Sequence, residues 1–151
     1  TAGAGFGAYL GAAGDFNGDG RADLSIGAPC LPYLGEFIQG QGMAFVYPGN
    51  VEGPAATPMT TLTGMYLSTS FGTYLGGFGD FNGDGFGDLS ILETGEVRGG
   101  DGSRRPPLWV YFGSNEGVSS ATRWDLTPTT REFTSRLAFH VLLPQPVLGG
   151  V

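Results

Sequence analysis

The sequence contains one long pattern twice, and this restricts the fold more than any other feature. Residues 6–26 read FGAYLGAAGDFNGDGRADLSI, and residues 71–91 read FGTYLGGFGDFNGDGFGDLSI, with a constant shift of 65 positions. Further along, the segment AFVYPGNVEG, which ends at Gly53, matches WVYFGSNEG, which ends at Gly117, with a shift of 64. Repeats of this kind are supersecondary units that stack on one another, because a single unit cannot bury its apolar face alone.

Each repeat is predicted to contain four short β-strands. Met43 to Tyr47 and its counterpart are rich in aromatic and β-branched residues, and a Gly-Asn or Gly-Ser pair follows each of them, as in hairpins. No stretch keeps the 3.6-residue period of an amphipathic helix, so a helical solenoid is disfavoured. The predicted strands are residues 7–13, 23–27, 43–47 and 57–62 in the first repeat and residues 72–78, 88–92, 108–112 and 122–126 in the second.

Four strands per repeat are what one blade of a β-propeller needs. The 29 glycines among 151 residues allow many tight turns, and the 40% hydrophobic content is sufficient for a core. We therefore predict an all-β fold with two four-stranded antiparallel propeller-type blades, which form a partial propeller or part of an oligomeric or larger one. The predicted parts are a first blade at residues 1–64, a second blade at 65–128, and residues 129–151 as a degenerate third repeat or an interface tail.

Two blades leave one apolar face uncovered at each end, because propeller blades need neighbours on both sides. Residues 137–151 add Leu, Val and Phe side chains and no acidic residue, a composition typical of an interface. Three arrangements stay open: a fragment of a longer protein, a ring built with copies of the chain, or a different partner that covers the open faces. The apolar stretch at residues 137–143 is too short to cross a bilayer, so we expect no membrane span.

An aspartate-rich loop joins the first two predicted strands of each repeat, at residues 15–23 and 80–88. Carboxylate or amide oxygens occupy positions 1, 3, 5 and 9 of both loops, and glycine at position 6 permits a sharp reversal. Calcium takes six to eight oxygen ligands in a flexible shell, which includes backbone carbonyls. The predicted ligands are the side chains of Asp15, Asn17, Asp19 and Asp23 with the carbonyl of Arg21, and those of Asp80, Asn82, Asp84 and Asp88 with the carbonyl of Phe86.

The charge distribution favours a cation in each loop. Six of the 14 acidic residues lie in the two loops, and three carboxylates in nine residues repel one another without a cation. We expect two Ca²⁺ ions, which would change the net charge from −7 to −3, and we expect each loop to act independently. Asx turns that bind nothing, or magnesium in a smaller octahedral shell, are the alternatives. An EF-hand is excluded, because position 12 is Ile26 or Ile91 where that motif needs a bidentate Glu.

The order of these motifs resembles the FG-GAP repeat, the blade of integrin α-subunit propellers and of many bacterial secreted proteins. Phe6-Gly7 and Phe71-Gly72 match the FG, and Gly27-Ala28-Pro29 matches the GAP, which Leu92-Glu93-Thr94 replaces in the second repeat. The resemblance implies calcium in the loops between the first two strands and an extracellular or cell-surface location, where calcium is millimolar. It does not imply integrin ligand binding, which in that family depends on loops and a partner subunit.

Several other functions are disfavoured by the sequence. Seven Arg, no Lys and 14 acidic residues make a nucleic-acid-binding surface improbable. His140 and Cys30 are the single residues of their types, and no Ser, His and Asp in a suitable arrangement indicate a catalytic triad. We therefore expect no catalysis.

The segments between the second and third strands differ most between the repeats. The one in the second repeat contains Asp101, Arg104 and Arg105, which we predict as a candidate ligand-binding loop, because functional residues concentrate on loops and Arg pairs well with anionic groups. A solvated connection is the alternative.

Two classes of function follow. The first is a calcium-binding extracellular β-propeller repeat protein that serves as a non-catalytic binding or adhesion module, with a protein or carbohydrate partner at the cell surface. The second is a structural scaffold subunit, or a fragment of a larger secreted enzyme or surface assembly.

Overall fold

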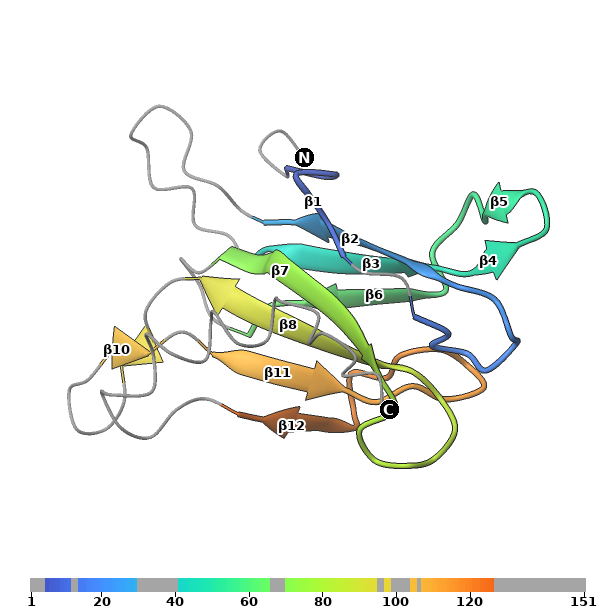
Figure 1. The fold of residues 1–151 in the computed structure, drawn as a ribbon. Coiled ribbons are helices and arrows are strands. Elements are labelled where there is room, and N and C mark those ends of the chain that lie inside the picture. Colours follow the sequence, from blue (N-terminus) through green and yellow to red (C-terminus); the bar gives the residue numbers. More distant parts are fainter. Residues whose placement is uncertain are drawn as a thin grey trace, which may run out of the picture.

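The computed structural model describes residues 5–11, 14–29, 41–65, 70–94, 97–98, 104–105 and 107–126. These residues form two four-stranded antiparallel sheets and two short hairpins, so the predicted all-β fold is confirmed (Figure 1). The strands are β1 (Tyr9–Leu10), β2 (Leu24–Ala28), β3 (Met43–Tyr47), β4 (Gly49–Asn50), β5 (Gly53–Pro54), β6 (Thr60–Thr63), β7 (Ser70–Gly79), β8 (Asp88–Thr94), β9 (Val97–Arg98), β10 (Arg104–Arg105), β11 (Leu108–Tyr111) and β12 (Arg123–Asp125).

Each repeat forms one sheet whose strands follow one another in sequence order. The first sheet has the order β1-β2-β3-β6, and the second has the order β7-β8-β11-β12. In the first sheet Ile26 lies opposite Phe45, and in the second Ile91 lies opposite Trp109, so the two sheets share one register. The predicted pairs of strands are thus confirmed in both repeats, with ends that differ by a few residues.

The first strand differs between the two repeats. The prediction of equal strands at 7–13 and 72–78 is wrong in length, since β1 has two residues and β7 has ten. The reason is packing: β7 pairs with β8 on one side and also touches the first sheet, through a parallel bridge between Gly42 and Phe71. In the described residues β1 pairs with β2 alone.

Two short hairpins were not expected as strands. β4 pairs with β5 after the third strand of the first sheet, and β10 pairs with β9 within the second connection. The fourth strand of the first repeat begins at Thr60 and not at residue 57, because Pro58 has no N–H to donate to a sheet.

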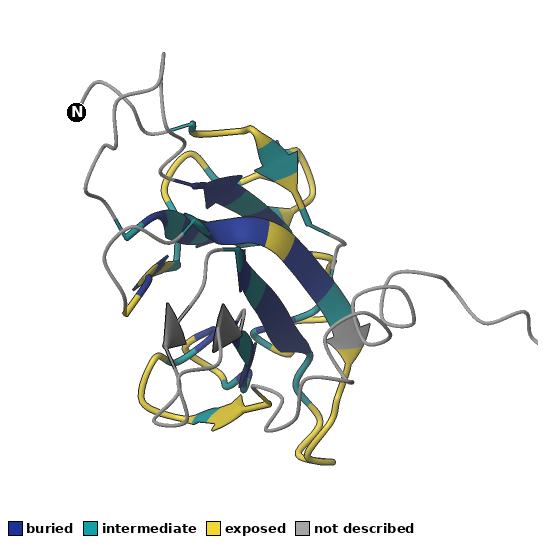
Figure 2. Cartoon of the chain, turned by 90° about the vertical axis from the view of Figure 1, so that its left-hand side faces the viewer, coloured by how far each residue is buried: buried dark blue, intermediate teal, exposed yellow. Residues whose placement is uncertain are grey.

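The hydrophobic core lies between the two sheets. Figure 2 shows the buried residues concentrated on the central strands and the exposed residues in the loops around them. Because side chains alternate along a strand, one face of each sheet turns toward the other sheet. The core residues are Phe16, Ala44, Val46 and Leu62 from the first repeat and Phe71, Leu75, Leu89, Ile91, Trp109, Tyr111 and Val118 from the second.

The FG of the second repeat rests on the glycine of the GAP in the first. A Cβ atom on Gly27 would collide with the carbonyl oxygen of Gly72, and one on Gly72 would collide with that of Met43. Gly72 also has a φ of 84°, which favours glycine. The backbone of β7 therefore packs directly against the backbones of β2 and β3 at this point, and this contact closes one side of the core between the sheets.

The same motif is uncovered in the first repeat. Phe6 is 54% exposed, whereas its counterpart Phe71 is 0% exposed; Leu10 is 68% exposed, whereas its counterpart Leu75 is 8% exposed. The outward face of the first sheet is therefore open among the described residues, as the uncovered end of a blade stack would be.

Several predicted features lie outside the described residues. These include Cys30, His140, Asp101 and residues 127–151, so the interpretation of the tail stays a prediction. Among the residues described, no helix is long and apolar enough to cross a membrane.

The two FG motifs provide a matched test of blade packing. We expect Phe71→Ala to lower the free energy of unfolding by about 3–5 kcal/mol, the usual cost of removing a buried phenylalanine. Phe6→Ala removes only an exposed ring that contacts Phe45, so it should cost about 1 kcal/mol. Urea denaturation of both variants measures the difference, and equal losses would contradict the arrangement of the sheets described here.

Candidate metal centres

The two aspartate loops lie at the same end of the stacked sheets (Figure 1). Residues 15–23 connect β1 to β2, and residues 80–88 connect β7 to β8. Glycine at position 6 has a positive φ in both loops, 81° at Gly20 and 93° at Gly85. Because this conformation strains other residue types, the glycines allow each loop to turn its polar side chains inward.

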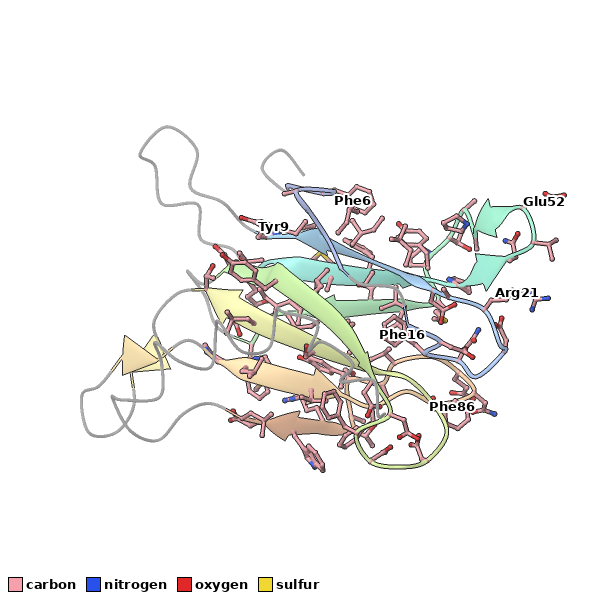
Figure 3. The ribbon with its side chains drawn as sticks, in the orientation of Figure 1. Phe6, Tyr9, Phe16, Arg21, Glu52 and Phe86 are labelled. Carbon is pink, nitrogen blue, oxygen red and sulfur yellow. The ribbon has the colours of Figure 1, made fainter. Side chains whose placement is uncertain are left out.

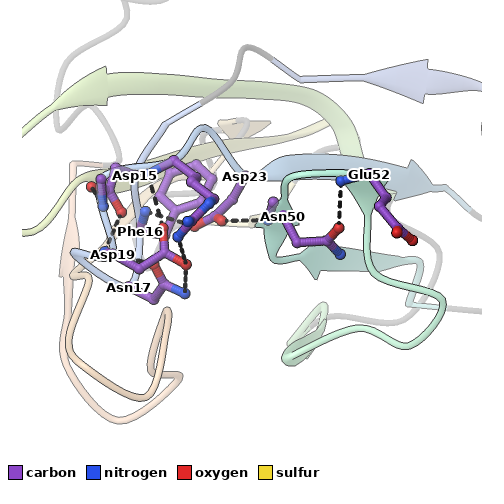
Figure 4. Close-up of polar contacts among 10 residues, drawn as sticks. Asp15, Phe16, Asn17, Asp19, Asp23, Asn50 and Glu52 are labelled. Carbon is purple, nitrogen blue, oxygen red and sulfur yellow. Dashed lines mark hydrogen bonds and ion pairs between the residues drawn. The ribbon is translucent and has the colours of Figure 1, made fainter.

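In the first loop, side-chain oxygens accept hydrogen bonds from the loop's own backbone (Figure 4). The two carboxylate oxygens of Asp15 accept from the N–H of Asp19 (3.0 Å) and of Gly20 (2.8 Å). Asn17 Oδ1 also accepts from Asp19 N–H (3.1 Å), and Asp19 Oδ1 accepts from Arg21 N–H (2.8 Å). The side chains at positions 1, 3 and 5 are thus held by a compact turn.

The second loop has the same network. Asp80 accepts from the N–H of Gly83 (2.6 Å), Asp84 (3.0 Å) and Gly85 (2.7 Å). Asn82 Oδ1 accepts from Asp84 N–H (3.2 Å), and Asp84 Oδ1 accepts from Phe86 N–H (3.0 Å). The hydrogen bond from Gly85, followed by those from other loop amides, lowers the pKa of the Asp80 carboxyl, because the amides favour the charged form.

The aspartate at position 9 closes each loop onto the sheet. Asp23 Oδ2 accepts from Phe16 N–H (2.8 Å), and its Oδ1 accepts from Gly49 N–H (2.8 Å) after β3. In the second repeat, Asp88 binds the N–H of Phe81 (2.6 Å) and of Gly113 (3.0 Å) in the same way. Both carboxylates are buried, so each one joins the start of its loop to the end of the third strand.

The sequence prediction missed this link to the third strand. Its signal is a glycine two residues past the end of that strand in both repeats, Gly49 and Gly113, with a shift of 64. A side chain there would collide with the carbonyl oxygen of Ala22 or Gly87 at position 8 of the loop. A glycine therefore allows its N–H to reach the carboxylate.

Negative charge accumulates in the first loop. Burial raises the pKa of Asp23, and the nearby carboxylates of Asp19 and Asp15 raise it further, against the hydrogen bonds from Gly49 and Phe16. A cation bound among these groups would act in the opposite direction. Arg21 approaches Asp19 at 3.9 Å between its Nη1 and Oδ2, a weak exposed pair that does not neutralise the loop.

The donor atoms of both loops fit a hard cation in their chemistry. All are oxygens, which suits calcium better than softer metals. A carboxylate has about four lone-pair positions, and Asp15 uses two in the hydrogen bonds described, so it keeps capacity for a metal. Among the described residues, however, no three His, Cys, Asp or Glu side chains lie close enough together to hold a metal ion. The predicted calcium ligands therefore stay a prediction.

The predicted ligand-binding loop is only partly described. Arg104 and Arg105 form β10, with Arg104 opposite Arg98 of β9, and the positions of their side chains are not described. Asp101 lies outside the described residues. The role of these three residues as a ligand site therefore stays a prediction.

A buried polar cluster that the sequence did not reveal lies between the sheets. Glu93 is fully buried, and its Oε2 accepts from Trp109 Nε1 at 3.3 Å. The Arg123 guanidinium lies 5.0 Å from the centre of the Trp109 ring. Burial raises the pKa of Tyr111 to about 12, against a lowering contribution from the Arg123 charge and with a smaller raising contribution from the Glu93 charge. The one sequence signal was the Glu that replaces the alanine of the GAP motif.

The FG-GAP repeat family matches residues 7–47, which include the first aspartate loop and the strands on both sides of it. This match concerns the first repeat of the chain. The two four-stranded antiparallel sheets are consistent with FG-GAP propeller blades.

The chain is also similar to integrin α chains. It is 32% identical to integrin alpha-4 of Xenopus laevis over 117 residues, which are 75% of this chain and 10% of that protein. It is 34% identical to integrin alpha-IIb of Mus musculus over 113 residues, 70% of this chain and 10% of that protein. A further relative, 32% identical over 112 residues, is the phosphatidylinositol-glycan-specific phospholipase D of Dictyostelium discoideum, with 70% of this chain and 11% of that protein covered. The chain thus spans about a tenth of the length of these curated relatives.

The closing aspartate provides a test of the loop that needs no metal. Asp23→Asn keeps the size of the side chain but turns an N–H₂ toward one of the two backbone donors, so one buried N–H loses its acceptor. We expect a loss of about 1–3 kcal/mol in the free energy of unfolding in the presence of a chelator. The matched control is Asp19→Asn, an exposed residue of the same loop, which should change the stability much less. Equal effects of the two substitutions in chemical denaturation would refute the closing role of Asp23.

Proposed function

We propose that this chain is a calcium-binding, extracellular β-propeller repeat module that acts in binding or adhesion without catalysis. The observation that carries the proposal is the equality of the two loops: positions 1, 3, 5 and 9 hold the same residue types and make the same backbone hydrogen bonds in both repeats. Because the same hydrogen-bond network is present in both loops, it is a property of the repeat and not of one particular turn.

Calcium is the favoured ion for three reasons. The donors are all oxygens, the glycines with positive φ permit the turn that gathers these oxygens, and FG-GAP repeats often bind calcium. In the proposed sites, Asp15, Asn17, Asp19 and Asp23 with the carbonyl of Arg21 hold one ion, and Asp80, Asn82, Asp84 and Asp88 with the carbonyl of Phe86 hold the other. The bound ion would neutralise carboxylates that otherwise repel one another.

An extracellular or cell-surface location agrees with the similarity to integrin α chains. Calcium sites of extracellular modules have dissociation constants of about 10⁻⁴–10⁻³ M, so they fill where calcium is millimolar. The resemblance to bacterial secreted proteins stays a proposal, because the relatives named above are eukaryotic.

We further propose that another blade covers the open face of the first sheet. This face carries exposed Phe6 and Leu10 with half-buried Ile26 and Phe45, and the equivalent face of the second sheet is the one that packs into the core. We expect the covering blade to have a glycine in its second strand, at the position that contacts Phe6-Gly7. Gly27 makes the equivalent contact with Phe71-Gly72.

A head-to-tail ring of copies is less favoured by the same comparison. Leu92 stands in the second repeat where Gly27 stands in the first, and a side chain at that position meets the backbone of the incoming FG. The second sheet therefore does not repeat the surface that receives Gly72. Additional blades or another subunit fit the open face better than a second copy does.

A second candidate function is a scaffold within a larger secreted enzyme or surface assembly. The similarity to a phospholipase D favours it, since the chain matches only 11% of that protein. In this case the blades carry no catalytic residue themselves. Partners of either candidate would be proteins or carbohydrates at a cell surface, and the net charge of −7 disfavours nucleic acid.

Calcium titration tests the main proposal. We expect isothermal titration calorimetry to show two ions per chain, and a free calcium concentration of 100 times the dissociation constant to add about 2.7 kcal/mol of stability per site. Asp19→Ala combined with Asp84→Ala should remove binding and lower the melting temperature to that of the chelated wild type. A wild-type protein that binds no calcium at millimolar concentration would refute the proposed function.

The open face predicts association or exposed apolar surface. We expect the full chain to form larger species as its concentration rises, and we expect the double substitution of Phe6→Ser and Leu10→Ser to reduce this. Val51→Ser is the control, because Val51 is also highly exposed but lies in the turn between β4 and β5. Static light scattering measures the mass, and a wild-type monomer at every concentration that also fails to bind an apolar dye would count against the open face.

A further inference from the structure

The two aspartate loops contact each other directly. The N–H of Gly87, at position 8 of the second loop, donates to the carbonyl oxygen of Asp15, at position 1 of the first, at 2.7 Å. The Phe86 ring covers Gly18, since a Cβ on Gly18 would lie 2.7 Å from Cε1 of that ring. Phe16 and Phe86 both lie at the loop end of the sheets in Figure 3.

A second connection runs through the turn that follows β11, the third strand of the second sheet. Ser114 N–H donates to the carbonyl oxygen of Phe16 at 3.2 Å, and the neighbouring Gly113 N–H donates to Asp88 at 3.0 Å. Phe16 N–H in turn donates to Asp23 at 2.8 Å. The two carboxylates at position 9 are thus joined by a continuous path of hydrogen bonds and short main-chain segments.

One peptide group belongs to both loops. The carbonyl of Phe86 is the predicted backbone ligand of the second loop, and the N–H on the same planar peptide is that of Gly87, which holds Asp15. An ion that restricts the orientation of the Phe86 carbonyl therefore also restricts the Gly87 N–H, which positions the first loop. In the first loop the counterparts Arg21 and Ala22 are exposed, so the arrangement is particular to the junction between the two described blades.

From these contacts we propose that Phe86 and Gly87 are positioning residues of the first loop, and that the two loops bind calcium with positive cooperativity. The cooperativity rests on the proposed function, whereas the positioning does not. Binding at the second loop orders the shared peptide. The first loop then loses less conformational entropy when it binds its own ion, so its affinity rises. This revises the expectation from sequence that each loop acts independently.

The first part of the test uses metal-free protein. Phe86→Ala leaves every side-chain oxygen of both loops in place but removes the ring from Gly18. We expect amide hydrogen exchange at Asp19 and Gly20 to accelerate by about fivefold or more, the lower end of typical coupling. Phe81→Ala is the matched control, because Phe81 lies in the same loop and is 48% exposed; it should leave exchange in the first loop unchanged. Equal effects of the two variants would overturn the positioning role.

The second part measures calcium binding in each loop through the NMR signals of the Gly20 and Gly85 amides. We expect Asp84→Ala, which disables the second site, to weaken binding at the first by about fivefold or more. Asp19→Ala should weaken the second site by the same factor, because thermodynamic coupling is reciprocal. We expect the Phe86→Ala variant to bind calcium at both sites with weaker coupling between them. The Phe81→Ala variant should retain the coupling of the wild type.

The outcomes separate the two proposals. If the wild type binds two ions and the single-site variants keep wild-type affinity at the remaining site, the cooperativity is wrong and the proposed function stands. If the wild type binds no calcium, the proposed function and the cooperativity both fall, and the exchange rates in metal-free protein still decide the positioning role.

Discussion

The close approach of two backbones at Gly27 and Gly72 is the constraint on which the rest of the structure depends. It allows β7 to pair with its own sheet while it lies against the first one. Phe71 and Leu75 are buried as a result, and the side chains of both sheets close into one core. A side chain at Gly27 would separate the sheets and expose this layer, so the glycine of the GAP motif is a packing element in the fold.

The same approach brings the two aspartate loops together at one end of the sheets. Each loop is organised first by its own amides and then by a buried aspartate that binds the end of the third strand. The carboxylates therefore stabilise the loops through hydrogen bonds without a metal, and a bound cation would add to this arrangement. The hydrogen bond from Gly87 N–H to the carbonyl oxygen of Asp15 connects the two loops directly.

Equivalent residues of the two repeats differ because they have different neighbours. Phe16 is 0% exposed under the second repeat, and its counterpart Phe81 is 48% exposed. The opposite holds on the other side of the stack, where Phe6 is open and Phe71 is buried. Among the residues that the structure describes, each repeat thus has one covered and one open side, which is the pattern expected of consecutive members of a longer series of blades.

The sequence by itself determined the number of repeats, the four strands of each, their order and the position of both loops. Periodic patterns and the glycines of tight turns are local, so one sequence suffices to read them. It did not determine the unequal lengths of β1 and β7, the burial of Glu93 against Trp109, or the hydrogen bonds from Gly49 and Gly113 to the closing aspartates. These features join residues that are far apart in the chain, and only the stacking of the two sheets decides which of them meet.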